Sequence, residues 1–257
     1  MRYIESFQND AAIQGAVDAG TLGHPYVALD DQTGKIDWDG KVIDYSKKYF
    51  TIEALESGIF YIRKSGFNYS INGEDWISTT GLTELSLNQG DSVRIKGTTR
   101  ADYLLSGQTK SFNAYGNIES LEYGDNFIGK TATYVNDKAF YCLFSNSTKL
   151  MDVSNLVLPS TDTEVGTYGY MFSGCTSIKV APVLPQASLT NTCYLEMFSG
   201  CSSLKYIKCL ATNMTARNCL LNWVSGVAAT GTFVKAAGAT WPTGASGIPS
   251  GWTVINA

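Results

Sequence analysis

Apolar positions between residues 139 and 227 return at a fixed interval. Segments 168–178 and 194–204 are near copies with the pattern Tyr-x-x-Met-Phe-Ser-Gly-Cys, and Phe172 is followed by Phe198 after 26 residues. A more divergent copy occupies 140–150, 28 residues ahead of the first full copy, and a partial copy occupies 220–227. Self-similarity at a period of this size is the signature of a repeat protein. The sequence therefore predicts a solenoid.

Each copy predicts the same local structure. Its tyrosine and phenylalanine are four residues apart, which places them on one face of a short helix. Gly174 and Gly200 stand where that helix would end, and the apolar stretches 180–184 and 206–210 predict short buried strands. One copy cannot bury its faces alone, so stacked copies should align equivalent residues in ladders. The predicted core ladder consists of Phe144, Phe172, Phe198, Cys175, Cys201, Leu150, Ile178 and Leu204.

Residues 41–130 alternate apolar and polar positions in short runs separated by turns, a spacing typical of an antiparallel β-sandwich. Tyr69 and Trp76 flank the turn at Asn72-Gly73, where they could form a sugar-stacking platform or belong to the sandwich core. The expected strands are 50–54, 59–62, 69–71, 75–78, 83–87, 92–96 and 111–115.

Residues 1–40 predict a helix over 11–19 and a hairpin of 26–29 with 35–38. This segment is too small to fold alone, so its apolar side chains should either dock on a partner or cap the next domain. The candidate anchoring residues are Tyr3, Ile4, Phe7, Ile13, Val17, Tyr26 and Trp38.

The expected fold class is thus mixed and β-rich (α+β), in three parts. Residues 1–40 form an N-terminal anchoring segment, 41–130 a β-sandwich, and 131–257 the repeat solenoid. Strands at 231–235 and 251–255 should close the solenoid as a β cap, with Trp241 and Trp252 covering its last repeat.

The net charge and the positions of the cysteines disfavour several classes of function and of covalent structure. The net charge is −4 and no run of Lys and Arg occurs, so we expect no nucleic-acid partner. No apolar stretch approaches the roughly 18–20 residues of a membrane span, so we expect no membrane insertion. Cys175 and Cys201 share one repeat position, and Cys193 and Cys219 another. Such positions favour buried thiols over the three disulfides that six cysteines could form.

The sequence offers little support for a catalytic or cofactor-binding motif. Residues 124–131 match the phosphate-loop pattern G-x-x-x-x-G-K-[ST], but a polar stretch precedes them where a buried strand is needed, which favours a simple turn. His24 is the only histidine, which disfavours a Ser-His-Asp or Cys-His site and a zinc site. The acidic pairs Asp30-Asp31 and Asp37/Asp39 surround a turn, with a weak calcium site as the alternative. We expect no enzyme and no cofactor.

The repeat resembles a known family. Met-Phe-Ser-Gly-Cys followed by Ser-Ile or Ser-Leu, with Leu184-Pro185 after the first copy, is similar to the BspA-type leucine-rich repeat. That repeat is found in surface proteins of gut anaerobes and in structural proteins of their phages. The opening residues 3–29 resemble the start of appendage proteins of such phages, including crAss-like ones. The resemblance implies a solenoid that binds host surfaces.

These observations predict a phage virion protein, a head fibre or capsid decoration that displays its repeats for weak binding to the host surface or its glycans. The first residues carry no secretion leader, which favours the virion over the bacterial surface. Expected partners are capsid or fibre subunits, in a homo- or hetero-oligomer. The alternatives are a tail fibre or receptor-binding protein, a bacterial cell-surface adhesin, and a carbohydrate-active enzyme.

Overall fold

The computed structural model describes residues 35–36, 42–128, 137–159 and 164–257. The chain forms two compact units, Met1–Tyr45 and Ser46–Ala257. In the first, β1 (Lys35–Ile36) pairs antiparallel with β2 (Val42–Ile43). The predicted helix over 11–19 and the predicted strand at 26–29 lie outside the described residues, and the pairing of 35–36 with 42–43 was not predicted. The described part is rich in strands and poor in helix, which confirms the β-rich class.

The second unit begins with an antiparallel sheet in the order β9-β3-β8-β5-β6, preceded by the short 3-10 helix η1 (Tyr45–Lys47). A separate two-stranded sheet is formed by β4 and β7. All seven predicted strands are present, within a few residues of their expected bounds. They are β3 (Phe50–Ala54), β4 (Gly58–Ile62), β5 (Phe67–Ile71), β6 (Ile77–Ser78), β7 (Thr83–Leu87), β8 (Ser92–Gly97) and β9 (Phe112–Asn117).

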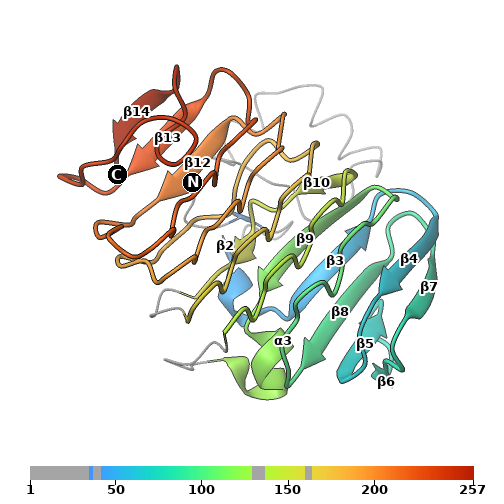
Figure 1. Ribbon diagram of the computed structural model, residues 1–257. Coiled ribbons are helices and arrows are strands. Elements are labelled where there is room, and N and C mark those ends of the chain that lie inside the picture. The colour runs from blue at the N-terminus through green and yellow to red at the C-terminus, as the bar shows by residue number, and fades with distance from the viewer. Residues whose placement is uncertain (1–34, 37–41, 129–136, 160–163) are drawn as a thin grey trace. The chain divides into compact units, whose positions relative to one another are not determined.

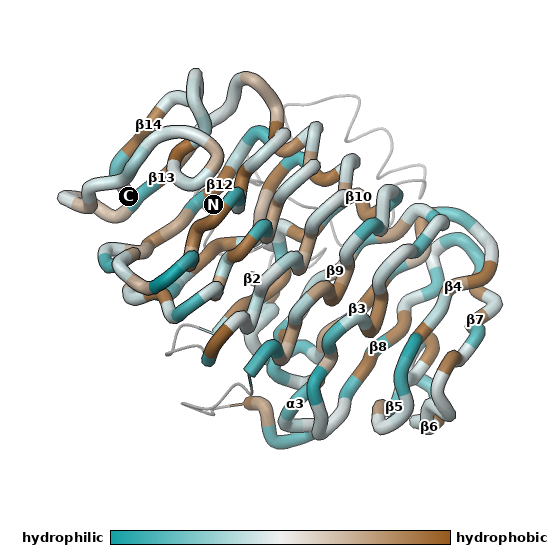
Figure 2. The backbone as a smooth tube through the Cα atoms, viewed as in Figure 1, coloured by the Kyte–Doolittle hydropathy of each residue, from teal (hydrophilic) through white to brown (hydrophobic). Residues whose placement is uncertain are grey.

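Alternating side chains turn one face of the larger sheet into the apolar core, which continues into the repeats where Phe112 lies 6.4 Å from Phe144 between ring centroids. Along β8, Val93 and Ile95 are fully buried while Ser92, Arg94 and Lys96 are only partly buried. Figure 2 shows hydrophobic and hydrophilic segments interleaved along the chain. Phe60 of β4 meets Phe112 of β9 edge to face, with ring centroids 6.1 Å apart. The β4–β7 pair therefore covers one face of the larger sheet.

A short helical segment follows β9. The α-helix α3 (Ser120–Tyr123) leads directly into the 3-10 helix η2 (Gly124–Phe127). The Ser120 hydroxyl ties α3 to the sheet, because it accepts the Phe50 N–H at 2.9 Å and donates to the Ile95 carbonyl at 3.1 Å. The phosphate-loop pattern thus starts after a helix instead of a buried strand, and its Lys-Thr pair lies outside the described residues.

Beyond β9 the pairing becomes parallel. The strands β10 (Leu150–Asp152) and β11 (Leu156–Val157) both pair with β9. At the other end, β12 (Tyr206–Cys209), β13 (Thr232–Lys235) and β14 (Thr253–Asn256) form a three-stranded parallel sheet. Figure 1 shows the intervening chain crossing between these strands in successive turns. The predicted strand at 180–184 is reduced to isolated bridges to β12.

The turn segments of successive repeats stack on one another through main-chain hydrogen bonds. Phe140 N–H donates to the Thr167 carbonyl at 3.0 Å, and Tyr168 N–H donates to the Cys193 carbonyl at 3.1 Å. The alternate N–H groups close turns inside one repeat, as Met171 N–H does with the Tyr168 carbonyl. Every second amide therefore joins one repeat to the next.

These turns are not helices, so the helical prediction for each repeat was wrong. Positive φ values recur at every fourth residue, as at Gly166, Tyr170 and Gly174. A left-handed residue at that interval interrupts any α-helix. The four-residue spacing of tyrosine and phenylalanine matches a helical turn, but here it reflects the period of these turns.

The stack also begins earlier than the repeat in the sequence. Tyr103 N–H donates to the Tyr141 carbonyl at 3.0 Å, and Leu105 N–H to the Leu143 carbonyl at 3.0 Å. Residues 101–107 thus occupy the place of one more turn. Its sequence trace is Tyr-Leu-Leu-Ser-Gly at 103–107, which parallels Tyr-Met-Phe-Ser-Gly at 170–174.

The stack has an aromatic core. The rings of Phe144 and Phe172 lie 5.4 Å apart with 9° between their planes, and Phe198 continues this column. Cys175 Sγ donates to the Phe144 carbonyl, and burial raises the pKa of this thiol to about 12. All six cysteines of the chain are free and buried. The eight residues of the predicted ladder, fully buried without exception, are Phe144, Phe172, Phe198, Cys175, Cys201, Leu150, Ile178 and Leu204.

Tryptophans cover the last turn. Trp223 stacks on Tyr194 at 6.0 Å and is itself covered by Trp241 at 5.8 Å. The indole N–H of Trp223 donates to the Gly247 carbonyl, and that of Trp252 to the Ala228 carbonyl. Among the described residues, no helix is long and apolar enough to cross a bilayer.

Candidate interaction surface

The sequence-predicted anchoring residues and the acidic pairs cannot be placed. They lie outside the described residues, as does the single histidine, His24. The anchoring residues concerned are Tyr3, Ile4, Phe7, Ile13, Val17, Tyr26 and Trp38, and the acidic pairs are Asp30 with Asp31 and Asp37 with Asp39. In the part of the chain that the structure describes, no three His, Cys, Asp or Glu side chains gather where they could hold a metal ion. The surfaces considered below are those of the second unit.

Three tyrosines from successive turns form a continuous row on the outer side of the stack. The ring of Tyr141 lies between those of Tyr103 and Tyr170, with centroid distances of 5.9 Å and 5.4 Å. Neighbouring rings meet edge to face, at 62° and 61°. Tyr103 is 49% exposed and the other two rings are partly exposed. We call Tyr103, Tyr141 and Tyr170 the tyrosine row.

The backbone of the turns sets this row in place. Tyr103 and Tyr170 occupy one register position of their turns, with φ values of 59° and 56°. Tyr141 stands one residue ahead of that position in the intervening turn. Its ring lies over Gly169, where an added Cβ would come within 3.0 Å of two ring atoms. A larger residue at 169 would displace the middle ring of the row.

Charged groups stand beside the row. Tyr170 donates its hydroxyl hydrogen to Glu196 Oε1 at 3.2 Å, and Lys138 Nζ lies 5.5 Å from the Tyr141 ring centroid. Asp102, next to Tyr103 in the chain, pairs with Lys64 at 2.5 Å. The Glu196 carboxylate thus lies at the Tyr170 end of the row, and the Asp102 carboxylate lies at the Tyr103 end.

The tyrosines of the row remain neutral phenols. A hydrogen bond with Cys142, and then burial, raises the pKa of Tyr103 to about 12. Burial, reinforced by the Glu196 carboxylate, also raises the pKa of Tyr170. The row therefore offers uncharged rings with polar hydroxyl tips.

A row of serines accompanies the tyrosines. Each of five successive turns has serine at the same register position, and each of these residues is partly exposed. Ser106 Oγ donates to the main-chain carbonyl of Tyr103 in the same turn, at 3.1 Å. We call these residues the serine row: Ser106, Ser145, Ser173, Ser199 and Ser225.

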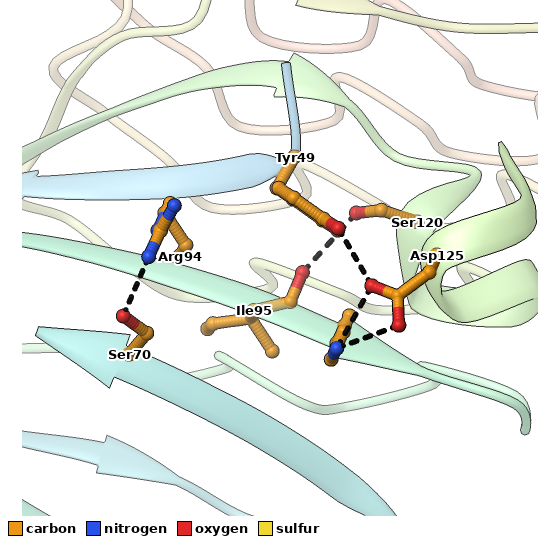
Figure 3. Close-up of polar contacts among 7 residues, drawn as sticks. Tyr49, Ser70, Arg94, Ile95, Ser120 and Asp125 are labelled. Carbon is orange, nitrogen blue, oxygen red and sulfur yellow. Dashed lines mark hydrogen bonds and ion pairs between the residues drawn. The ribbon is translucent and has the colours of Figure 1, made fainter. Parts of the chain in front are cut away.

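A second cluster lies on the outer face of the antiparallel sheet. Tyr49 donates its hydroxyl hydrogen to Asp125 Oδ1 at 2.6 Å, and Lys96 Nζ reaches the same oxygen at 2.8 Å (Figure 3). The ammonium group of Lys96 also lies 4.2 Å from the Trp76 ring centroid, and the Arg94 guanidinium lies 5.2 Å from it. This cluster joins η2, β8 and the loop before β6.

The cluster does not provide the sugar-stacking platform considered for Tyr69 and Trp76. Tyr69 is buried in the core, only 9% exposed. Trp76 is contacted by two cations and by Tyr49, whose ring meets it edge to face at 5.2 Å. These contacts join the loop that carries Trp76 to β8 and to the chain before β3, which is a structural role. For Tyr69 the structure agrees with the core alternative that the sequence also allowed. The tyrosine row was not among the predicted residues.

Comparison of the chain with protein-family models, with curated proteins and with solved structures finds no match.

Proposed function

We propose that the chain is a non-enzymatic structural protein of a bacteriophage particle, a head fibre or capsid decoration that displays its repeat stack to the host surface. The observation that carries the proposal is the stack itself. Its turns repeat the BspA-like sequence pattern, and alternate amides of each turn donate to the next, as at Phe140, Tyr168 and Tyr194. We assign it as a BspA-type leucine-rich-repeat solenoid that follows a β-sandwich and ends in a β cap.

A scaffold of this kind suits display. In a repeat protein each unit contacts its neighbours and the stack presents an extended surface. Here the aromatic column of Phe144, Phe172 and Phe198 fills the interior of the stack. The outer side of the turns is left to carry variable residues at a fixed spacing, which is the property a host-binding surface needs.

Attachment to the particle is assigned to residues 1–40. Their resemblance to the start of phage appendage proteins supports this role, with capsid or fibre subunits as partners. Several copies on one particle would strengthen weak binding to the host, because linked sites raise the effective concentration of each other's ligand.

The test is to locate the protein on purified particles. Antibodies raised against residues 46–257 would be applied to virions from the source culture and followed by immunogold electron microscopy. Label on the capsid is the expected result, and label on the tail would make the protein a tail fibre. Label on uninfected cells with none on virions would overturn the proposal in favour of a bacterial adhesin.

A further inference from the structure

We infer that the tyrosine row and the serine row together form a binding site for a linear, neutral glycan that lies across successive turns. The inference deepens the proposed function, on which it rests, by naming the site and the class of ligand. Three observations carry it: the geometry of the row, the backbone conformation of its tyrosines, and the charges at its ends.

The geometry fits a sugar chain. The face of a pyranose ring is lined with C–H groups that pack on an aromatic ring, and its hydroxyls lie around the edge. Tyrosine offers a rigid apolar ring with a polar tip, so it binds such amphipathic groups with little loss of side-chain entropy. The ring centroids of Tyr103, Tyr141 and Tyr170 are 5.9 Å and 5.4 Å apart, about one sugar unit per turn.

The serine row supplies hydrogen-bonding groups beside the rings. Ser106, Ser145 and Ser173 belong to the same three turns as the tyrosines and are partly exposed. Ser106 donates its hydrogen to the Tyr103 carbonyl and Ser145 accepts a hydrogen bond from Asn146 Nδ2, so each hydroxyl keeps its remaining hydrogen-bonding capacity for a sugar hydroxyl. A glycan running along the stack would therefore meet an aromatic surface and a line of hydroxyls at the same spacing.

The backbone does not require tyrosine at positions 103 and 170, so the rings are free to serve another role. Tyr103 and Tyr170 have φ values of 59° and 56°, in the left-handed region that bulky residues seldom adopt. The strain is of the order of 1–2 kcal/mol per residue. Asn222 fills the same register position in a later turn, with a φ of 52°, and asparagine tolerates this conformation well. Cys142 and Glu196 fill the same position in the other turns, with φ values of 55° and 48°. The backbone thus accepts several side chains at this position and does not itself call for tyrosine.

The charges favour a neutral ligand. Glu196 accepts a hydrogen bond from Tyr170 at one end, and Asp102 stands beside Tyr103 at the other, paired with Lys64. Lys138 stands beside Tyr141, so the row is flanked by charges of both signs, and these select neither an acidic nor a basic polymer. The tyrosine row is one side chain wide and has charged groups beside it. A stable protein partner buries a broader patch than this, so a narrow linear ligand suits the row better.

The experiment is affinity gel electrophoresis of the full-length protein in gels that contain a β-glucan, a xylan, a mannan or a galactan, with polygalacturonate as the acidic polymer. The test variant combines Tyr103→Asn with Tyr170→Asn, which removes two rings while suiting the backbone. The matched control is Asn222→Gly, in the same register position beyond the row. We expect retardation of the wild type and the control by at least one neutral polysaccharide. The double variant should bind at least about tenfold more weakly, and its melting temperature should fall by no more than about 3 °C, because relief of backbone strain offsets the lost ring contacts.

The inference fails if no neutral polysaccharide retards the wild type, if the double variant binds as well as the wild type, or if only polygalacturonate is bound. Immunogold labelling of virions is independent of these gels. Labelled virions with blank gels would overturn the glycan site alone. Unlabelled virions with retardation by a neutral polysaccharide would overturn the particle assignment and leave the site standing.

Discussion

The ring of Phe198 lies flat on the ring of Phe172, with centroids 5.4 Å apart and 3° between the ring planes. The two residues are 26 positions apart in the sequence, one full repeat. Cys201 Sγ, from the same turn as Phe198, donates to the Phe172 carbonyl at 3.0 Å. Ring stacking and hydrogen bonding thus set the same register between two turns.

Removing a ring from this column should destabilise the whole second unit. We expect Phe198→Ala to lower the free energy of unfolding by about 3–5 kcal/mol, because it leaves a cavity in a fully buried site. Urea unfolding followed by tryptophan fluorescence measures this loss. Leu221→Ala, at a leucine that is 40% exposed, is the control and should cost less than about 1 kcal/mol. Equal losses in the two variants would contradict the stacked core.

Substitution of Gly116 tests how closely β9 approaches the chain that precedes β3. A Cβ at Gly116 would lie 2.2 Å from the Tyr49 carbonyl oxygen, and the residue has a φ of 88°. Gly90 has a similar φ of 92° with nothing within 4 Å of its added Cβ. We expect Gly90→Ala to cost about 1–2 kcal/mol from backbone strain, and Gly116→Ala to cost more than about 4 kcal/mol. Matching unfolding midpoints for the two variants would refute this close approach.

The cysteines should be unreactive in the folded protein. Burial raises the pKa of Cys175 and of Cys209 to about 12, and the thiolate is the reactive form. Protein prepared without reductant should therefore react slowly with Ellman's reagent when native and release six equivalents in denaturant. Fewer than six equivalents in denaturant would indicate disulfides, and rapid native reaction would place the thiols at the surface.

Asp125 should give the fold an acid-sensitive contact. Hydrogen bonds from Lys96 and Tyr49 hold the pKa of this carboxyl below its ordinary value of 3.8. A depressed folded pKa means that the stabilisation is present above about pH 4 and is lost as the pH falls through the folded value. The difference in urea midpoint between wild type and Asp125→Asn should therefore shrink between pH 6 and pH 3. A constant difference would show that the contact does not depend on the charge.

The strands and the repeat could be predicted from the sequence because both rest on periodic burial. Alternation in segments such as 83–87 and 92–96 gave strands close to their observed bounds. The type of turn could not be predicted, since a four-residue spacing of aromatics fits both a helix and a chain of left-handed turns. The φ of 56° at Tyr170, unusual for tyrosine, excludes the helix and has no signal in the sequence.

The tyrosine row was beyond prediction for a different reason. Tyr103 belongs to the turn at 101–107, where the repeat pattern is reduced to the short segment Tyr-Leu-Leu-Ser-Gly. Tyr141 stands one register position away from Tyr103 and Tyr170, so alignment of the repeats does not bring the three together. Their proximity depends on how the rings lean across the turns, and on the space above Gly169.

The most direct test of the account is attachment of the protein to particles through its first forty residues. Full-length protein and a form lacking residues 1–40 would each be mixed with virions stripped of the native protein and then sedimented, with folding checked by thermal unfolding. We predict that the full-length protein sediments with the virions and the shortened form stays in solution with an unchanged melting temperature. Co-sedimentation of the shortened form would contradict the N-terminal anchor, and failure of both forms to bind would contradict the particle assignment.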